Sequence, residues 1–171
     1  GPLVIAGVYV DRDIARRFLE ADIQDSKRIG SDKRIHDLAN IIRATPGAVG
    51  DTVAIGPERY NDLYEKFGNL NSLLGWGHAR VIENLLVRKP DCPRALSDKF
   101  ADASVIEKAL LKNGQAIKLE QRTKAESDLA VAAASIQRIA SARNPSTAPA
   151  SAASPGRASR SAICSAGRCA V

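Results

Sequence analysis

Three carboxylates in this chain could hold a metal ion together. Glu126 and Asp128 come just before an Ala-rich run, residues 129–135, that is typical of a helix packed closely against a sheet. Acidic side chains stabilise the unpaired N–H groups of a first helical turn, so an ordinary helix start also explains these two acids. A third acid, Asp98, follows a short predicted strand. Because Mg²⁺ prefers carboxylate oxygens, the three acids are candidate ligands of one metal site.

The elements predicted around these acids place them at one edge of a sheet. Strands are predicted at 94–97 and 116–119, and helices at 103–112 and from about Glu126 onward. Strands that alternate with helices at this spacing pair in parallel, with the helices on the sheet faces. The carboxyl ends of parallel strands share an edge, so Asp98 and Glu126 are expected to lie close together. The predicted fold class is α/β, a mainly parallel or mixed sheet flanked by helices.

The first half of the chain fits the same fold class. Residues 3–10 are almost continuously apolar, as in a strand covered on both faces. Further elements are predicted as follows: a partly helical segment at 11–20, helices at 31–44, 57–67 and 71–86, a turn at 45–51 and a strand at 52–55. His78 lies within the last of these helices. With no acid near it in the sequence, we interpret His78 as a packing or hydrogen-bonding residue.

Basic residues are densest in and after the loop at 25–31, where they are Lys27, Arg28, Lys33 and Arg34. Such a cluster is ordinarily a solvated surface, although it could also bind phosphates. The formal charge of the chain is +6, of which three arginines and no acid in 144–171 supply +3. The remaining +3 of residues 1–143 is a mild excess that favours nucleic acid over a membrane as partner. An aromatic content of 4% argues against a base-stacking surface for single strands.

Composition also predicts the location and the domain organisation. No apolar run approaches the ~20 residues that span a bilayer, and no signal peptide is recognisable. Cys92 is isolated in the sequence, and Cys164 and Cys169 have no His beside them, so we expect a reduced, cytoplasmic protein without structural zinc. Residues 1–143 are predicted to form one domain. The Ala/Ser/Pro/Arg-rich segment 144–171 is expected to be a disordered tail without core contacts, either natural or the out-of-frame end of a truncated gene.

Several stretches in a consistent order resemble the type 2 ribonucleases H, and ribonuclease HIII in particular. The resemblance extends from Gly1 to about Ser135. The stretches that carry it are Gly-Pro-Leu-Val at 1–4, Asp-Ser-Lys at 25–27, and the segments 60–74, 77–86, 95–100 and 122–128.

This resemblance implies a ribonuclease H-like fold and a monomeric endonuclease that cuts the RNA strand of RNA/DNA hybrids with two Mg²⁺ or Mn²⁺ ions. Asp98 matches the third of four family carboxylates and Glu126 matches the fourth, with Asp128 as a weaker candidate for the fourth. Asp98 and Glu126 are therefore the predicted catalytic residues, and all three acids are predicted metal ligands. The residues expected to bind the hybrid are Lys27, Arg28 and Lys124.

The chain also departs from the family pattern. The family's first two carboxylates belong to an Asp-Glu-x-Gly-Lys-Gly stretch that would precede Gly1, and the sequence contains no Met. We therefore expect a partial ribonuclease HIII whose activity is crippled. The alternatives are ribonuclease HII, a non-catalytic nucleic-acid-binding remnant, and an inert α/β fragment that does not stay folded.

Overall fold

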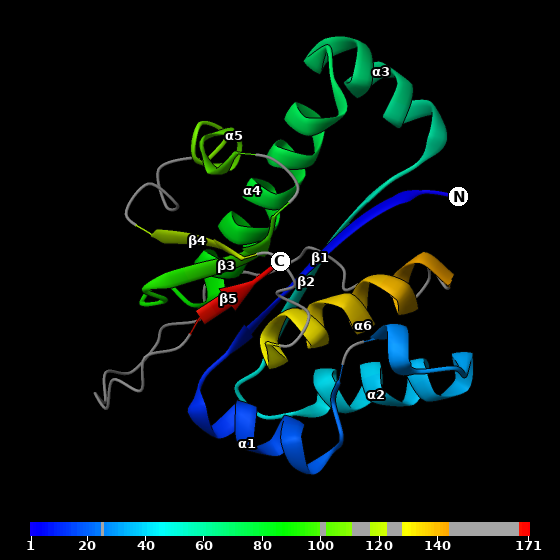
Figure 1. The fold of residues 1–171 in the computed structure, drawn as a ribbon, viewed down its shortest axis with the longest axis vertical. Coiled ribbons are helices and arrows are strands. Elements are labelled where there is room, and N and C mark those ends of the chain that lie inside the picture. Colours follow the sequence, from blue (N-terminus) through cyan, green and yellow to red (C-terminus); the bar gives the residue numbers. More distant parts are fainter. Residues whose placement is uncertain (25, 100–101, 111–116, 123–127, 144–167) are drawn as a thin grey trace.

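A computed structural model of the chain describes residues 1–24, 26–99, 102–110, 117–122, 128–143 and 168–171 (Figure 1). In this part of the chain, five strands form a single sheet in the order β2-β1-β5-β3-β4. The strands are β1 (Leu3–Val10), β2 (Val49–Ile55), β3 (Arg94–Asp98), β4 (Lys118–Arg122) and β5 (Arg168–Ala170). The helices are α1 (Arg12–Glu20), α2 (Asp32–Ala44), α3 (Pro57–Phe67), α4 (Leu70–Arg88), α5 (Ala103–Glu107) and α6 (Leu129–Arg143), with a short 3₁₀ turn η1 (Ser26–Arg28).

The sheet is mixed, which confirms the predicted α/β class. Strand β3 is parallel to β4 and to β5, whereas β1 is antiparallel to β2 and to β5.

Strand β2 begins at Val49, inside the segment 45–51 that was predicted as a turn. The turn itself is shorter than predicted because Gly47, at φ 83°, completes it in a left-handed conformation that favours glycine. Helix α5 ends at Glu107 instead of extending to residue 112, although residues 111 and 112 lie outside the described part.

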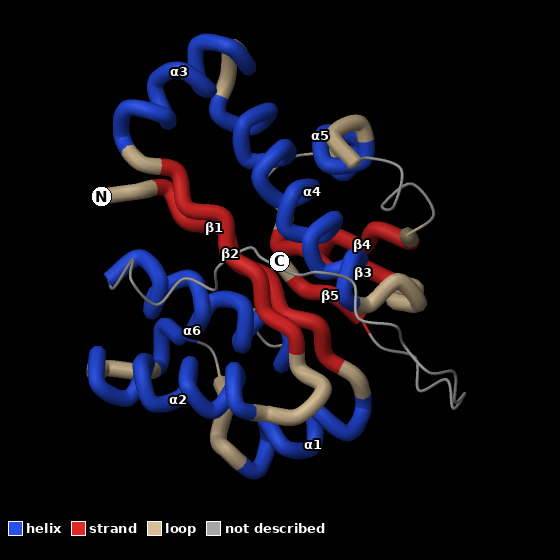
Figure 2. Tube along the Cα trace, turned by 180° about the vertical axis from the view of Figure 1, so that it is seen from behind, coloured by secondary structure: helices blue, strands red, loops and turns tan. Residues whose placement is uncertain are grey.

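Helices cover both faces of the sheet (Figure 2). Helices α1, α2 and α6 lie on one face, and α4 lies on the other with α3 and α5 beside it. Each face has its own apolar core because successive strand residues point to opposite sides. Members of the core under α6 include Val8, Phe18, Leu38, Ile42 and Ile136. Members of the core under α4 include Ile5, Val81, Leu85, Ile106 and Cys169.

Two glycines let α4 approach its neighbours closely. A Cβ atom on Gly77 would lie 2.2 Å from Ile5 Cδ1 on β1. A Cβ atom on Gly75 would lie 2.6 Å from Val105 Cγ1 and 3.0 Å from the Val105 carbonyl oxygen on α5. The backbone of α4 therefore packs directly against side chains of the sheet and against the backbone of α5.

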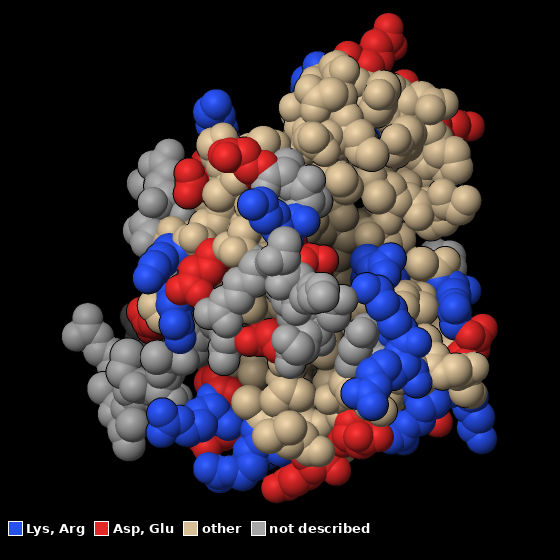
Figure 3. All heavy atoms as spheres, in the orientation of Figure 1, with Lys and Arg blue, Asp and Glu red and all other residues tan. Residues whose placement is uncertain are grey.

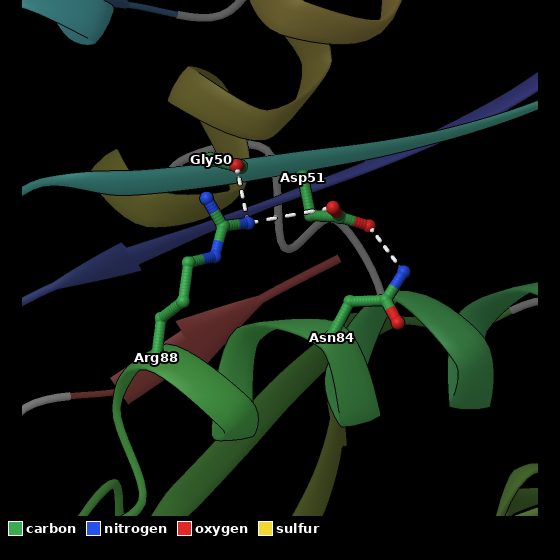
Figure 4. A network of polar contacts seen from close by, with 4 residues as sticks. All are labelled: Gly50, Asp51, Asn84 and Arg88. Atoms are coloured by element: carbon green, nitrogen blue, oxygen red, sulfur yellow. Dashed lines mark hydrogen bonds and ion pairs between the residues drawn. The ribbon is translucent and has the colours of Figure 1, made fainter. Parts of the chain in front are cut away.

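A polar network fastens the opposite end of α4 to strand β2 (Figure 4). Arg88 Nη2 donates to the Gly50 carbonyl oxygen at 2.8 Å and lies 3.4 Å from Asp51 Oδ1. Asn84 Nδ2 donates to Asp51 Oδ2 at 2.9 Å. Because both oxygens of the buried Asp51 carboxylate have a partner, we interpret this network as a structural tie.

The position of β5 corrects one expectation. The prediction that 144–171 makes no core contact is wrong for 169–171, since Cys169 and Ala170 are fully buried and Val171 is 8% exposed. The backbone of β5 lies between those of β1 and β3 and pairs with both. Residues 144–167 lie outside the described part, so their predicted disorder stays a prediction.

Among the helices that the structure describes, none is long and apolar enough to cross a membrane.

Candidate active site

Asp98, the last residue of β3, borders a cavity of about 340 Å³. Its carboxylate is exposed, and Oδ1 accepts a hydrogen bond from the Lys99 backbone N–H at 3.0 Å. The cavity lies between β1, α4 and α6. Its other lining residues are Leu3–Ala6 of β1, Leu74 and His78 of α4, Val131, Ala134, Ser135 and Arg138 of α6, and also Lys27 and Val171. Among the described residues that line this cavity, Asp98 is the one acidic side chain.

The strand register supports the prediction that the ends of β3 and β4 share an edge of the sheet. Asp98 is directly opposite Arg122, the last residue of the parallel neighbour β4. Glu126 follows four residues after Arg122, but Glu126 and Lys124 lie outside the described residues. Whether the Asp98 and Glu126 carboxylates meet at one metal pair therefore stays a prediction.

Asp128 has the ordinary role of a helix-start residue. Its Oδ1 accepts a hydrogen bond from the Ala130 backbone N–H at 2.9 Å, and its carbonyl oxygen accepts one from Ala132 at 2.8 Å. This arrangement caps the N-terminus of α6. Asp128 is not among the described residues that line the cavity, and its predicted role as a metal ligand stays a prediction.

The basic cluster at 27–34 is divided by the fold. Ser26 Oγ lies 2.6 Å from Ser135 Oγ of α6, and this contact holds η1 where Lys27 borders the cavity. Arg28 is exposed and does not line the cavity, and Arg34 lies 3.9 Å from Asp22. Figure 3 shows Lys and Arg side chains gathered over the region of α2 and α6. Lys27, which borders the same cavity as Asp98, makes this edge of the cavity suited to an anionic ligand.

Sequence reasoning missed Arg138 as a cavity residue. It shares one face of α6 with Val131, Ala134 and Ser135, all of which line the cavity at the three- and four-residue spacing of a helix. That periodicity, combined with the exposed charge, is the signal that could have identified it. Lys27, Arg138 and Asp98 line the same cavity, so two cationic side chains and one carboxylate side chain border it.

His78 belongs to the same cavity and hydrogen-bonds to Ser97. Its Nδ1 lies 3.1 Å from Ser97 Oγ, and Ser97 donates its hydroxyl proton to the Asp98 carbonyl oxygen at 3.1 Å. Which of the two atoms donates in the contact between His78 and Ser97 depends on the tautomer of the His78 ring. Burial lowers the pKa of His78 to about 4, so the ring is neutral at pH 7. The predicted hydrogen-bonding role agrees with this geometry, but the proximity to Asp98, twenty residues away, left no signal in the sequence.

Comparison with known proteins identifies the family. A profile of the family described as ribonuclease HII matches residues 1–144. This chain belongs to the ribonuclease HII family. Within it, a ribonuclease HIII of Protochlamydia amoebophila is 43% identical over 136 residues, and a ribonuclease HIII of Chlamydia pneumoniae is 46% identical over 138 residues. Both alignments include 80% of this chain but only 44% and 45% of the relatives, so the chain spans less than half of their length.

Solved structures of the family agree with the fold. The Q54A mutant of Bst-RNase HIII has a TM-score of 0.69 at 24% identity, covering 82% of this chain and 46% of that protein. Aquifex aeolicus RNase H3 has a TM-score of 0.62 at 28% identity, covering 82% and 50%. RNase HII of Archaeoglobus fulgidus, solved in a complex with PCNA, has a TM-score of 0.60 at 26% identity, covering 85% and 66%. The ribonuclease H-like fold and the resemblance to ribonuclease HIII are thereby confirmed.

Proposed function

We propose that this chain contributes part of the active site of an endonuclease that cuts the RNA strand of RNA/DNA hybrids. The observation that carries the proposal is the position of Asp98. Its exposed carboxylate stands at the shared end of two parallel strands and borders a cavity that also holds Lys27 and Arg138. Family membership supplies the reaction class, and the cavity supplies an acid and two cations where a phosphodiester would bind.

The described residues fit a divalent metal only in part. An exposed carboxylate at a strand end is a suitable ligand for a hard ion such as Mg²⁺ or Mn²⁺. Among the described residues, however, no group of three or more His, Cys, Asp or Glu side chains could hold an ion. Glu126, which lies two residues before Asp128, is the proposed further ligand from this chain. When bound, such ions activate a water molecule and neutralise the leaving oxygen of the cleaved phosphodiester.

The other cavity residues have proposed roles that do not involve the metal. Lys27 and Arg138 would contact phosphates of the hybrid, with Arg28 and Lys124 as further phosphate contacts. Such contacts position a nucleic acid without reading its sequence. Ser97, hydrogen-bonded to His78, would fix the backbone from which the Asp98 side chain extends. We expect the protein to act as a cytoplasmic monomer.

Replacement of one carboxylate tests this proposal. The chain described here should give little cleavage of an RNA/DNA hybrid in Mg²⁺, because Asp98 and Glu126 alone are too few ligands for two ions. Adding an upstream strand that carries Asp-Glu-x-Gly-Lys-Gly should restore cleavage. In that extended protein, Asp98→Asn should lower kcat by at least about 100-fold, since even residues that only support metal ligands contribute 10- to 100-fold.

Hybrid binding separates catalysis from recognition. Asp98→Asn should leave the Kd for the hybrid nearly unchanged. Lys27→Ala and Arg138→Ala should each weaken binding, and each should reduce the slope of log affinity against log salt concentration by about one. Asp13→Asn, a change at an exposed acid of α1, is the matched control for loss of one charge. Full cleavage by the extended Asp98→Asn protein would refute the role of Asp98. Binding without cleavage by every extended protein would favour the non-catalytic alternative.

A further inference from the structure

Two cysteines far apart in the sequence meet in the interior of the protein. Cys92 lies two residues before β3, and Cys169 is the middle residue of β5. Their sulfur atoms are 2.9 Å apart, and Cys92 Sγ also lies 3.3 Å from the Arg94 carbonyl oxygen. Cys92 is 7% exposed and Cys169 is fully buried. Sequence reasoning did not anticipate this pair, because it placed Cys169 in a disordered tail.

The cysteine pair lies at β5, the shortest described strand, which joins the two halves of the sheet. Strand β5 separates β1 from β3, and it contacts them through three residue pairs on one side and two on the other. A further hydrogen bond runs from the Val171 backbone N–H to the Leu96 carbonyl oxygen at 2.9 Å. Among the described strands, no direct pairing joins β2-β1 to β3-β4 except through β5. A covalent bond at Cys169 would therefore hold the central strand of the sheet in place.

We propose that Cys92 and Cys169 form a reversible disulfide that latches β5 to the rest of the sheet. The oxidant would be a low-molecular-weight disulfide such as oxidised glutathione. This inference depends on the geometry of the two thiols and not on the proposed nuclease activity. It predicts a modification site in the core that responds to the thiol–disulfide balance of the surroundings.

The reaction proceeds by two thiol–disulfide exchanges. The Cys92 thiolate attacks one sulfur of the oxidised glutathione, so that a mixed disulfide forms and one glutathione thiolate leaves. Cys169 then gives up its proton and attacks the Cys92 sulfur, which forms the internal disulfide and releases the second glutathione. Two electrons pass from the protein sulfurs to the oxidant, and the two thiol protons end on the two glutathione molecules.

The environment of the two thiols sets the order of attack. A hydrogen bond from the Cys169 thiol lowers the pKa of Cys92, whereas donating that bond, together with burial, raises the pKa of Cys169. Cys92 is thus the first nucleophile and Cys169 the resolving thiol. Transient opening of the three-residue strand would admit the oxidant to the otherwise buried pair.

Disulfide mapping of the full chain tests whether the Cys92–Cys169 disulfide forms. The protein is equilibrated in glutathione buffers of increasing oxidation, its remaining thiols are alkylated, and the linked peptides are identified by mass spectrometry. The native protein should give an intramolecular bond between Cys92 and Cys169 that dithiothreitol reverses. The oxidised protein should melt at least ~5 °C higher than the reduced one, because the bond closes a long loop.

The third cysteine provides an internal control. In guanidinium chloride the same oxidation should favour Cys164–Cys169, since the short separation of these two residues makes their loop the least costly to close. Cys164→Ser should keep the native response, whereas Cys92→Ser and Cys169→Ser should lose it. If the native protein stays reduced in a glutathione buffer that oxidises the denatured chain, the proposal is overturned. Oxidation of the native protein that gives mainly the Cys164–Cys169 disulfide or intermolecular disulfides would also overturn the proposal. The mapping uses the unaltered protein, so its result does not depend on whether a variant folds.

Discussion

At the scale of single residues, the cavity around Asp98 combines an exposed acid with a neutral histidine. His78 hydrogen-bonds to Ser97, which also donates to the backbone carbonyl of Asp98. A charged imidazolium at this position would have to be desolvated, which is why burial holds the pKa of His78 to about 4. The histidine is therefore suited to hold the Asp98 backbone in place and not to exchange protons near pH 7.

This shift predicts a pH dependence of stability. The unfolded chain protonates His78 near pH 6.5, whereas the folded protein does so only near pH 4. Between these values the unfolded state binds more protons, so the free energy of unfolding should fall as the pH drops from 6.5 toward 4, by up to about 3 kcal/mol. Urea unfolding across this range measures the effect. His78→Gln should flatten the curve relative to His36→Gln on α2, and an unchanged slope in both variants would contradict the assignment.

At the scale of elements, the ends of α2 and α3 carry clear local signals. Ser31 is a residue type that commonly caps helices, and its Oγ accepts a hydrogen bond from the Arg34 backbone N–H at 3.5 Å at the start of α2. Pro57 opens α3 and Gly68 closes it at φ 75°, which are the usual positions of these residue types at helix ends. These features depend on neighbours in the sequence. The early start of β2 depends on its pairing with β1, which the sequence pattern at 45–51 does not reveal.

The close packing of α4 leads to a prediction about its glycines. Gly75→Ala should lower the free energy of unfolding by about 1–3 kcal/mol, because the new methyl group would press on the backbone oxygen of Val105. Gly77→Ala should cost less, since its nearest neighbour is the movable end of the Ile5 side chain. Both changes gain about 1 kcal/mol of helix propensity, so their difference isolates the packing effect. Thermal and urea unfolding of the two variants would test the order, and an equal or reversed order would refute it.

At the scale of the whole molecule, β5 is what the sequence could not predict. Arg168-Cys169-Ala170 is too short for a periodic pattern and follows a long segment of Ala, Ser and Pro. Its strand conformation arises from the backbones of β1 and β3 on either side, which are remote in the sequence. The catalytic assignment meets a similar limit, because the cavity depends on which strands become neighbours and Glu126 lies outside the described residues.

The buried position of β5 predicts that changes there destabilise the entire fold. Ala170→Asp would place a carboxylate at a fully buried site and should cost about 3 kcal/mol or more, lowering the Tm by roughly 10 °C. Deletion of residues 168–171 should act in the same direction. Leu19→Asp, at a side chain that is 64% exposed, is the control and should change the Tm little. A truncated protein with an unchanged melting temperature would show that β5 adds no stability.

The pairing of Val8 with Ala170 also constrains the order in which the protein can be assembled during synthesis. The antiparallel β1-β2 pair and the parallel β3-β4 pair can form while the chain is growing, but the two pairs cannot join into one sheet until residue 170 has been added. Joining positions so far apart is a slow step, because the loop-closure entropy is lost before the contacts form. Until then, β1 and β3 would present open backbone edges to other nascent chains. The yield of folded protein should therefore depend on how well those edges are shielded until residue 170 has been added.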